Sequence, residues 1–140
     1  SASSGEAIVA TDVDSQGTTL HVEITGLERQ QDLIALSWRI TNTGDSDWDM
    51  SNLLGDTPAG LGLTVAGVSL VDAANSKRYR VARTGDPDRN PRCICSEYDI
   101  GTEAGETVPL YATFTAPPPE VTSVDVEFPV LGVFTDVPIS

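Results

Sequence analysis

The stretch Ile34-Ala35-Leu36-Ser37-Trp38-Arg39-Ile40-Thr41 alternates bulky apolar residues with small or polar ones. Successive side chains of a β-strand point to opposite faces of a sheet, so this alternation is typical of a strand with one buried face. The run stops at Asn42-Thr43-Gly44-Asp45, a turn signal in which the glycine can adopt a positive φ. The stretch therefore predicts a half-buried strand that ends in a turn.

The same alternation recurs along most of the chain. It is found at 20–25, 68–71, 79–81, 108–114, 124–128 and 133–139, where Pro138 favours a place near a sheet edge. Residues 72–76 are expected to form a hairpin connection and 45–62 a long loop, with any short helix in that loop or near Glu97. Because no stretch of helical length shows the helical period, the pattern predicts an all-β, antiparallel sandwich of about seven to nine strands.

The composition indicates one folded and strongly acidic domain. With 140 residues, of which 39% are hydrophobic, the chain can bury a single core. Residues 1–5 look like a small-residue linker left after an export segment or anchor, and 6–140 are expected to form the domain. No apolar run approaches the ~20 residues that span a bilayer, and the net charge of -13 disfavours nucleic acid as a partner. We expect a monomer without a cofactor.

The only two cysteines, Cys93 and Cys95, are one residue apart at the end of a basic stretch. In an extended segment their Cα atoms would lie about 6.6 Å apart with parallel side chains, so a disulfide requires a tight turn at Ile94. A structural disulfide is the favoured interpretation. Two free thiols, an intermolecular bridge, a soft-metal site and thiol redox chemistry remain open as alternatives.

Six of the eight basic residues gather in one stretch. They are Lys77, Arg78, Arg80, Arg83, Arg89 and Arg92. The simpler interpretation is a solvated hairpin face that balances acidic residues elsewhere, and the more specific one is a contact with an anion or an acidic polymer. The five arginines are therefore candidates for an interaction surface.

An apolar group lies in the predicted long loop, beside acidic residues. It consists of Trp48, Met50, Leu53 and Leu54. These side chains either pack back over the end of the sandwich or, if exposed, form an apolar patch rimmed by charge, which is typical of a partner surface. We include them in the candidate interaction surface.

Two short acidic runs partly match the pattern of calcium loops. Asp12-Val13-Asp14-Ser15-Gln16-Gly17 departs from the pattern at Gln16 and lacks the flanking helices, so an acidic turn at 14–17 is the favoured interpretation. The second run, 45–49, has carboxylates at alternate positions but no following glycine. The weak calcium candidates are Asp12, Asp14, Asp45, Asp47 and Asp49.

The chain carries no catalytic signature. Its one histidine, His21, occupies a polar position in the alternating pattern of a strand. The chain has no nucleophile elbow, zinc-protease, P-loop or dinucleotide motif. An enzyme built on His21 and nearby carboxylates is one further hypothesis, to be judged by where the fold places that histidine. We expect the protein not to be an enzyme.

Several runs in the chain match a pattern found in a group of exported proteins. They are Arg92-Cys93-Ile94-Cys95-Ser96, Tyr111-Ala112-Thr113-Phe114-Thr115-Ala116-Pro117-Pro118, and residues 68–72, 77–79, 105–107 and 134–139. Together they resemble a secreted immunoglobulin-like domain of actinobacteria, of the kind that precedes OmpA-like peptidoglycan-binding domains. Telokin-like extracellular antigens are more distantly similar.

This resemblance spans about residues 30–140. It implies an immunoglobulin-like sandwich that is one module of a longer envelope protein, with any wall-binding residues beyond Ser140 and no catalytic residues. We therefore expect a non-catalytic, exported module of the cell envelope that is a spacer or binds a protein or another envelope partner. The alternative is a metal-binding or thiol redox protein that uses Cys93 and Cys95.

Overall fold

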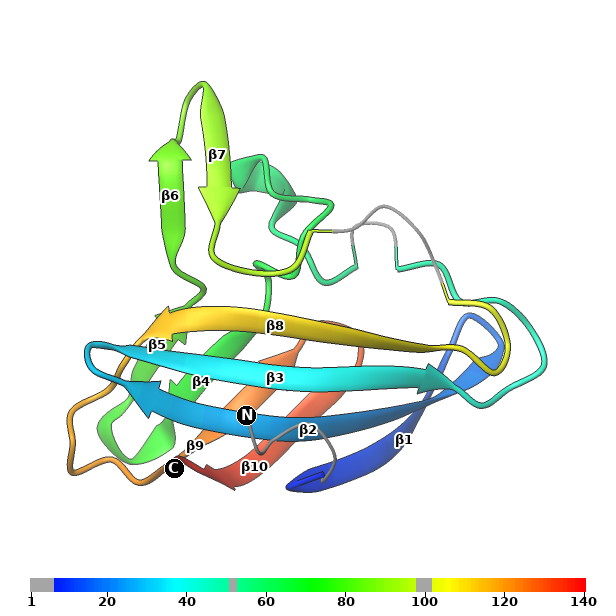
Figure 1. Cartoon of the computed structure of the whole chain (residues 1–140), viewed down its shortest axis with the longest axis horizontal. Helices are drawn as coiled ribbons and strands as arrows, with labels where there is room; N and C mark the ends of the chain where they lie inside the picture. Colours follow the sequence, from blue (N-terminus) through cyan, green and yellow to red (C-terminus); the bar gives the residue numbers. More distant parts are fainter. Residues whose placement is uncertain (1–6, 51–52, 98–101) are drawn as a thin grey trace.

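The computed structural model describes residues 7–50, 53–97 and 102–140, so the predicted linker at 1–5 lies outside the described residues. Figure 1 shows two layers of strands that face each other and one hairpin that stands away from them. The strands are β1 (Val9–Ser15), β2 (Thr18–Gln30), β3 (Leu33–Asn42), β4 (Ser69–Asp72), β5 (Lys77–Arg80), β6 (Arg83–Asp86), β7 (Asn90–Cys93), β8 (Thr107–Thr115), β9 (Ser123–Phe128) and β10 (Gly132–Pro138). Two 3₁₀ turns, η2 (Thr57–Ala59) and η3 (Ala73–Asn75), lie in the predicted loop and the predicted hairpin connection.

Two four-stranded antiparallel sheets form the sandwich. One has the order β1-β2-β3-β8 and the other the order β10-β9-β4-β5, while β6 and β7 form a separate two-stranded sheet. In the lettering of immunoglobulin domains, β2, β3 and β8 correspond to A, B and E, and β5, β4, β9 and β10 to C′, C, F and G. The predicted all-β, immunoglobulin-like sandwich is confirmed, with β1 added beside the A strand.

The described chain has three strands that the sequence did not predict, namely β1, β6 and β7. The residues of β6 are all exposed and those of β7 are at most half-buried, so neither strand shows a buried face in its sequence. The predicted turn at 14–17 is present but shifted by one residue, because Asp12 and Asp14 lie within β1, which ends at Ser15. Gln16 and Gly17 make the turn to β2 with φ of 56° and 79°, the positive values that a tight two-residue hairpin loop requires.

The predicted strand at 34–41 lies in the middle of the core as part of β3. Its inward side chains are Ile34, Leu36, Trp38 and Ile40, each at most 1% exposed. The ring of Trp38 lies 5.0 Å from that of Phe128 on β9, which in turn lies 5.6 Å from Phe134 on β10. Since β3 and β9 belong to opposite sheets, this aromatic contact joins the two layers.

Truncation of the Trp38 side chain should lower the stability of the protein more than a change on the outer face of β3. We expect Trp38→Ala to lower the free energy of unfolding by about 3–5 kcal/mol, because it removes a large buried ring and leaves a cavity. Urea denaturation followed by circular dichroism measures this. Ser37→Ala, on the outward face of β3, is the matched control and should change the stability by less than about 0.5 kcal/mol. Equal losses in the two variants would contradict the placement of Trp38.

Candidate functional site

A hairpin made of β6 and β7 projects from one side of the sandwich (Figure 1). Its strands pair from Arg83 and Cys93 at the base up to a turn at the tip. There the Asp86 carboxylate accepts a hydrogen bond from the Asp88 amide, and the Asp86 carbonyl accepts one from the Arg89 amide. Because β6 and the tip are exposed along their whole length, most side chains of the hairpin can reach a partner.

The hairpin begins and ends on the outer edge of β8. The Ala82 amide donates a hydrogen bond to the Thr113 carbonyl at 2.8 Å, and the Thr113 amide donates to the Ile94 carbonyl at 2.9 Å. Further along β8, the Ser96 amide donates to the Tyr111 carbonyl at 2.9 Å. The Ile94 amide also donates to the Ala82 carbonyl at 3.0 Å, so the two ends of the hairpin are tied to each other as well.

Cys93 and Cys95 are joined by a disulfide at the foot of β7. Their Cα atoms lie 5.3 Å apart, closer than the ~6.6 Å of an extended segment, because the chain bends at Ile94 as a bridge requires. Cys95 belongs to the buried core, whereas Cys93 is half-buried. The bridge therefore ties the projecting strand to a residue that the core holds in place.

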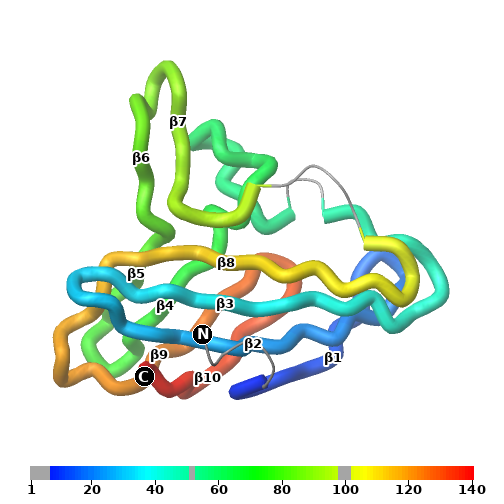
Figure 2. Tube along the Cα trace, viewed as in Figure 1, coloured from blue at the N-terminus to red at the C-terminus, as the bar shows by residue number. Residues whose placement is uncertain are grey.

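A loop at 53–67 lies beside the hairpin (Figure 2). Gly60 has a left-handed φ of +77°, and a Cβ atom on it would lie 2.9 Å from the Cγ of Pro91 on β7. Next to this contact, Thr64 pairs with Glu97 as an isolated β-bridge. Only glycine combines this φ with such a close approach, so Gly60 sets how near the loop comes to the hairpin.

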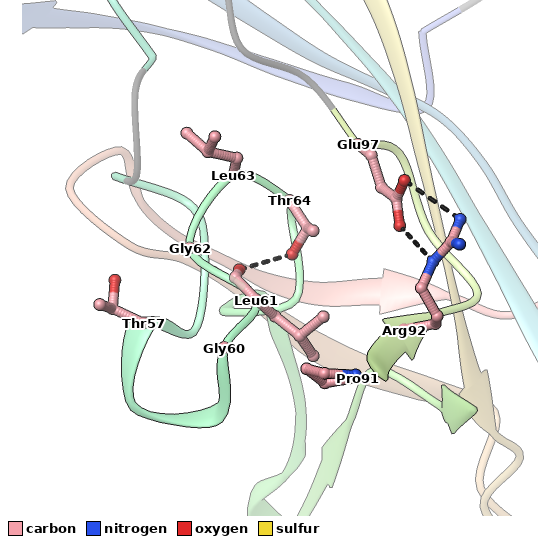
Figure 3. A pocket seen from close by; sticks show the side chains of 9 residues that line it. All are labelled: Thr57, Gly60, Leu61, Gly62, Leu63, Thr64, Pro91, Arg92 and Glu97. Atoms are coloured by element: carbon pink, nitrogen blue, oxygen red, sulfur yellow. Dashed lines mark hydrogen bonds and ion pairs between the residues drawn. The ribbon is translucent and has the colours of Figure 1, made fainter. Parts of the chain in front are cut away.

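Two open grooves flank the contact between this loop and β7. The first is shown in Figure 3 and is lined by Thr57, Gly60, Leu61, Gly62, Leu63, Thr64, Pro91, Arg92 and Glu97. The second, with a volume of about 400 Å³, is lined by three arginines, Arg80, Arg83 and Arg92, by the apolar residues Ala59, Leu61, Pro87 and Pro91, and by Thr84 and Gly85. We call the second one the arginine groove.

Carboxylates hold the three guanidinium groups of the arginine groove. Arg80 Nη2 and Arg83 Nη1 donate hydrogen bonds to the same oxygen, Asp56 Oδ2, at 2.5 and 2.9 Å. Arg92 donates from Nε and Nη2 to the two carboxylate oxygens of Glu97, at 3.1 and 3.3 Å (Figure 3). Three positive groups thus face two negative ones, which leaves an excess of one positive charge in a chain of net charge -13.

The other two predicted arginines lie outside the arginine groove. Arg89 is at the exposed tip of the hairpin. Arg78 on β5 donates to Glu127 on β9 at 2.5 Å, and this hydrogen bond raises the pKa of Arg78 above its ordinary value. The fold therefore brings Arg80, Arg83 and Arg92 together and leaves Arg78 and Arg89 apart from them.

The apolar part of the predicted interaction surface is wrong. Trp48, Met50 and Leu54 are at most 1% exposed, and Leu53 is half-buried against the core. The Trp48 amide donates to the Thr102 carbonyl at 2.8 Å, and the Trp48 indole donates to the Ser15 hydroxyl at 2.9 Å. The loop thus folds back over the end of the sandwich, because its large apolar side chains gain more from burial than from exposure to water.

The predicted calcium candidates are spread over the surface. Asp12 Oδ1 lies 2.7 Å from His21 Nδ1, and Asp14 accepts a hydrogen bond from the Thr19 hydroxyl at 3.0 Å. Asp45, Asp47 and Asp49 are exposed. Within residues 7–50, 53–97 and 102–140, no three histidine, cysteine or acidic side chains converge in a way that could hold a metal ion.

His21 lies on the outer face of the β1-β2-β3-β8 sheet, where its side chain is 36% exposed. Its ring contacts Asp12 on one side and lies 3.8 Å from Glu23 on the other. Arg39 donates to Glu23 at 2.7 Å, which lowers the pKa of Glu23 below its ordinary value and raises the pKa of Arg39. His21 is thus one member of a row of polar and charged side chains on this surface.

Comparison with known proteins identifies the fold of this chain. No family model and no curated protein matches it. Among solved structures it is similar to the 1.5 Å crystal structure of MPT63, a secreted protein from Mycobacterium tuberculosis, with a TM-score of 0.55. The match covers 94% of this chain and 95% of MPT63 at 10% sequence identity, so it shows a shared β-sandwich and carries no functional residue across.

The sequence did not predict which other residues pair with the arginines and complete the arginine groove. Asp56 and Gly60 lie in a Gly- and Asp-rich stretch that was expected only to be a long loop. Asp56 lies 24 positions from Arg80 and 27 from Arg83, so no local sequence pattern predicts that they pair. Arg92 and Glu97 lie only five positions apart, on either side of the cysteines. Among the ion pairs of the groove, theirs is the one that a local sequence pattern could have indicated.

Reduction of the disulfide should loosen the hairpin more than the sandwich. A ring closed over so few residues is expected to contribute only about 1.5 kcal/mol through chain entropy, so the reduced protein should stay folded. We expect hydrogen exchange of the Ile94 and Thr113 amides, which join the hairpin to β8, to rise far more than that of Val22 in the core. A uniform rise at all three amides on adding reductant would contradict this role.

Acidification should weaken the contact between Glu23 and Arg39. Since the folded state lowers the pKa of Glu23, this pair stabilises the fold above the ordinary carboxyl pKa and is lost as the pH falls through the lowered value. We expect Glu23→Gln to cost up to about 1 kcal/mol at pH 7 and progressively less as the pH falls below the ordinary carboxyl pKa, as measured by urea denaturation over a pH series. Glu120→Gln, in an exposed connection, is the control. A cost for Glu23→Gln that does not change with pH would contradict the pairing.

Proposed function

We propose that this chain is a non-catalytic, exported module of the cell envelope that binds a protein partner through the β6–β7 hairpin and the loop beside it. The observation that carries the proposal is the projecting hairpin, which the disulfide and the hydrogen bonds to β8 hold in one orientation. A rigid, exposed protrusion with a cluster of arginines is the kind of surface that protein partners recognise. Arginine is among the residues enriched at such interfaces.

Two observations support export. Disulfides persist in oxidising compartments, and the chain carries its two cysteines as one bridge. The structurally similar MPT63 is a secreted protein. As a separate finding, the part of the chain that the structure describes contains no helix long and apolar enough to cross a membrane. The resemblance to domains that precede OmpA-like peptidoglycan-binding domains makes the cell envelope the proposed location.

The chemistry of the arginine groove supports binding in preference to catalysis. Its ionisable groups are guanidinium ions paired with carboxylates, and a guanidinium ion keeps its proton under physiological conditions, so it serves recognition better than proton transfer. His21, the candidate catalytic residue of the enzyme hypothesis, lies on a different surface, the outer face of the sandwich. Cysteines joined in a disulfide have no thiolate to offer a metal ion, and the buried position of Cys95 at the foot of the hairpin supports a structural bridge.

Photo-crosslinking in the cells that make the full-length protein tests the proposal. A benzophenone amino acid at Thr84, on the exposed β6 strand, should crosslink to a protein in the exported fraction. The same amino acid at Thr135, exposed on β10, is the matched control and should give no such product. Intact-mass analysis with and without alkylation, together with metal analysis, is done on the same sample.

The outcomes separate the hypotheses. Crosslinking at neither position, or equally at both, would contradict binding through the hairpin and would leave a spacer role. Two alkylated cysteines and a stoichiometric metal ion would favour the metal-binding alternative. Protein found only inside the cell would contradict export.

A further inference from the structure

We propose that the arginine groove binds a short peptide segment of the partner that carries one or two carboxylates between apolar side chains. This inference rests on the proposed function, because it names the chemistry of the partner at the same hairpin. Three features of the groove lead to it: guanidinium donors that face solvent, a preorganised base, and an apolar lining between the charges.

The donors come from Arg80 and Arg92, whose side chains are 64% and 54% exposed. Each guanidinium group has five N–H donors, and Asp56 and Glu97 occupy only one of them on Arg80 and two on Arg92. The Arg92–Glu97 pair is exposed on both sides and therefore weak, so an incoming carboxylate can add to it or replace it at little cost. Since the groove has an excess of one positive charge, a carboxylate also neutralises it.

The base of the groove is held by Arg83. Its Nε donates to the Val81 carbonyl at 3.0 Å, its Nη2 to the Ala66 carbonyl at 3.3 Å and its Nη1 to Asp56 at 2.9 Å. One side chain thus joins the foot of the hairpin to the neighbouring loop. A binding surface that is already ordered loses less conformational entropy when the ligand arrives, so even a short peptide can bind.

The apolar lining selects a peptide over a phosphate-rich polymer. Ala59, Leu61, Pro87 and Pro91 lie in the same groove as the arginines. Apolar side chains of a peptide would cover these surfaces, whereas a chain of phosphate groups would leave them in water. Proline and alanine also lose little or no side-chain freedom on being covered, which favours their contribution to binding.

The overall charge sets an upper limit on the charge of the ligand. With a net charge of -13, the protein repels a densely charged polyanion as a whole. The Debye length is about 8 Å at physiological ionic strength, so a ligand with one or two carboxylates feels mainly the nearby arginines. Asp86 and Asp88 at the tip of the hairpin add to the penalty for a more acidic ligand.

Nuclear magnetic resonance titration of the oxidised, full 140-residue chain tests the inference at physiological salt. The probe is the blocked peptide Val-Glu-Val-Glu-Val, and the matched peptide carries Gln in place of each Glu. We expect the Glu peptide to shift the Thr84 and Arg92 amides but not the Thr135 amide, and the Gln peptide to bind about tenfold more weakly. Arg80→Gln and Arg92→Gln should each weaken binding about fivefold to tenfold.

Arg78→Gln is the control variant, because Arg78 pairs with Glu127 outside the groove, and it should change the affinity less than about twofold. Circular dichroism checks that each variant is folded. Equal weakening by Arg78→Gln, or equal binding of the two peptides, would overturn the inference.

The remaining outcomes identify other occupants. If inorganic tripolyphosphate shifts the groove amides and the Glu peptide does not, the groove is a site for an anionic polymer and the inference is wrong. Shifts that depend on protein concentration without any peptide would indicate a second copy of the chain and would also overturn it. A crosslink from Thr84 in cells together with no peptide binding would overturn only the peptide chemistry and leave the proposed function standing.

Discussion

The outer edge of β8 is the constraint from which the shape of this protein follows. A strand edge exposes unpaired amide and carbonyl groups that invite aggregation unless something covers them. Here two short segments, around Ala82 and around Ile94, pair with β8 at Thr113 and Tyr111. Because both segments return to the same edge, residues 83–93 between them have no room in the sandwich and leave it as the β6–β7 hairpin. The candidate site is thus a consequence of how the sheet is closed.

A two-stranded hairpin is marginally stable in water, so this one depends on contacts at its base. The disulfide anchors β7 to a buried cysteine, Gly60 lets the loop approach Pro91, and Arg83 joins that loop to the foot of β6. These contacts come from different parts of the sequence and act on the same short region. They order the arginine groove before any partner arrives, which is the property that supports a binding role.

The sequence predicted the sandwich because burial imposes a period of two on any strand with one buried face, as in Ile34-Ala35-Leu36-Ser37-Trp38. It failed for β6 and β7, whose residues bury no continuous face and so carry no such pattern. It also left open whether the loop residues Trp48 and Met50 were buried or exposed, and the interaction surface that included them is wrong. Loop burial depends on what lies across the fold, which a local pattern does not contain.

The sequence by itself determined the fold class, the need for a bend at Ile94 if the cysteines are bonded, and the gathering of basic residues in one stretch. Each of these follows from local geometry or composition. Only the tertiary structure decided which arginines share a groove, because Asp56 reaches Arg80 and Arg83 across 24 and 27 positions of chain. It also decided that Arg78 pairs with Glu127 instead, since β5 and β9 belong to one sheet on either side of β4. Side-chain neighbours across strands are set by register and sheet order, and neither is written in a local stretch of sequence.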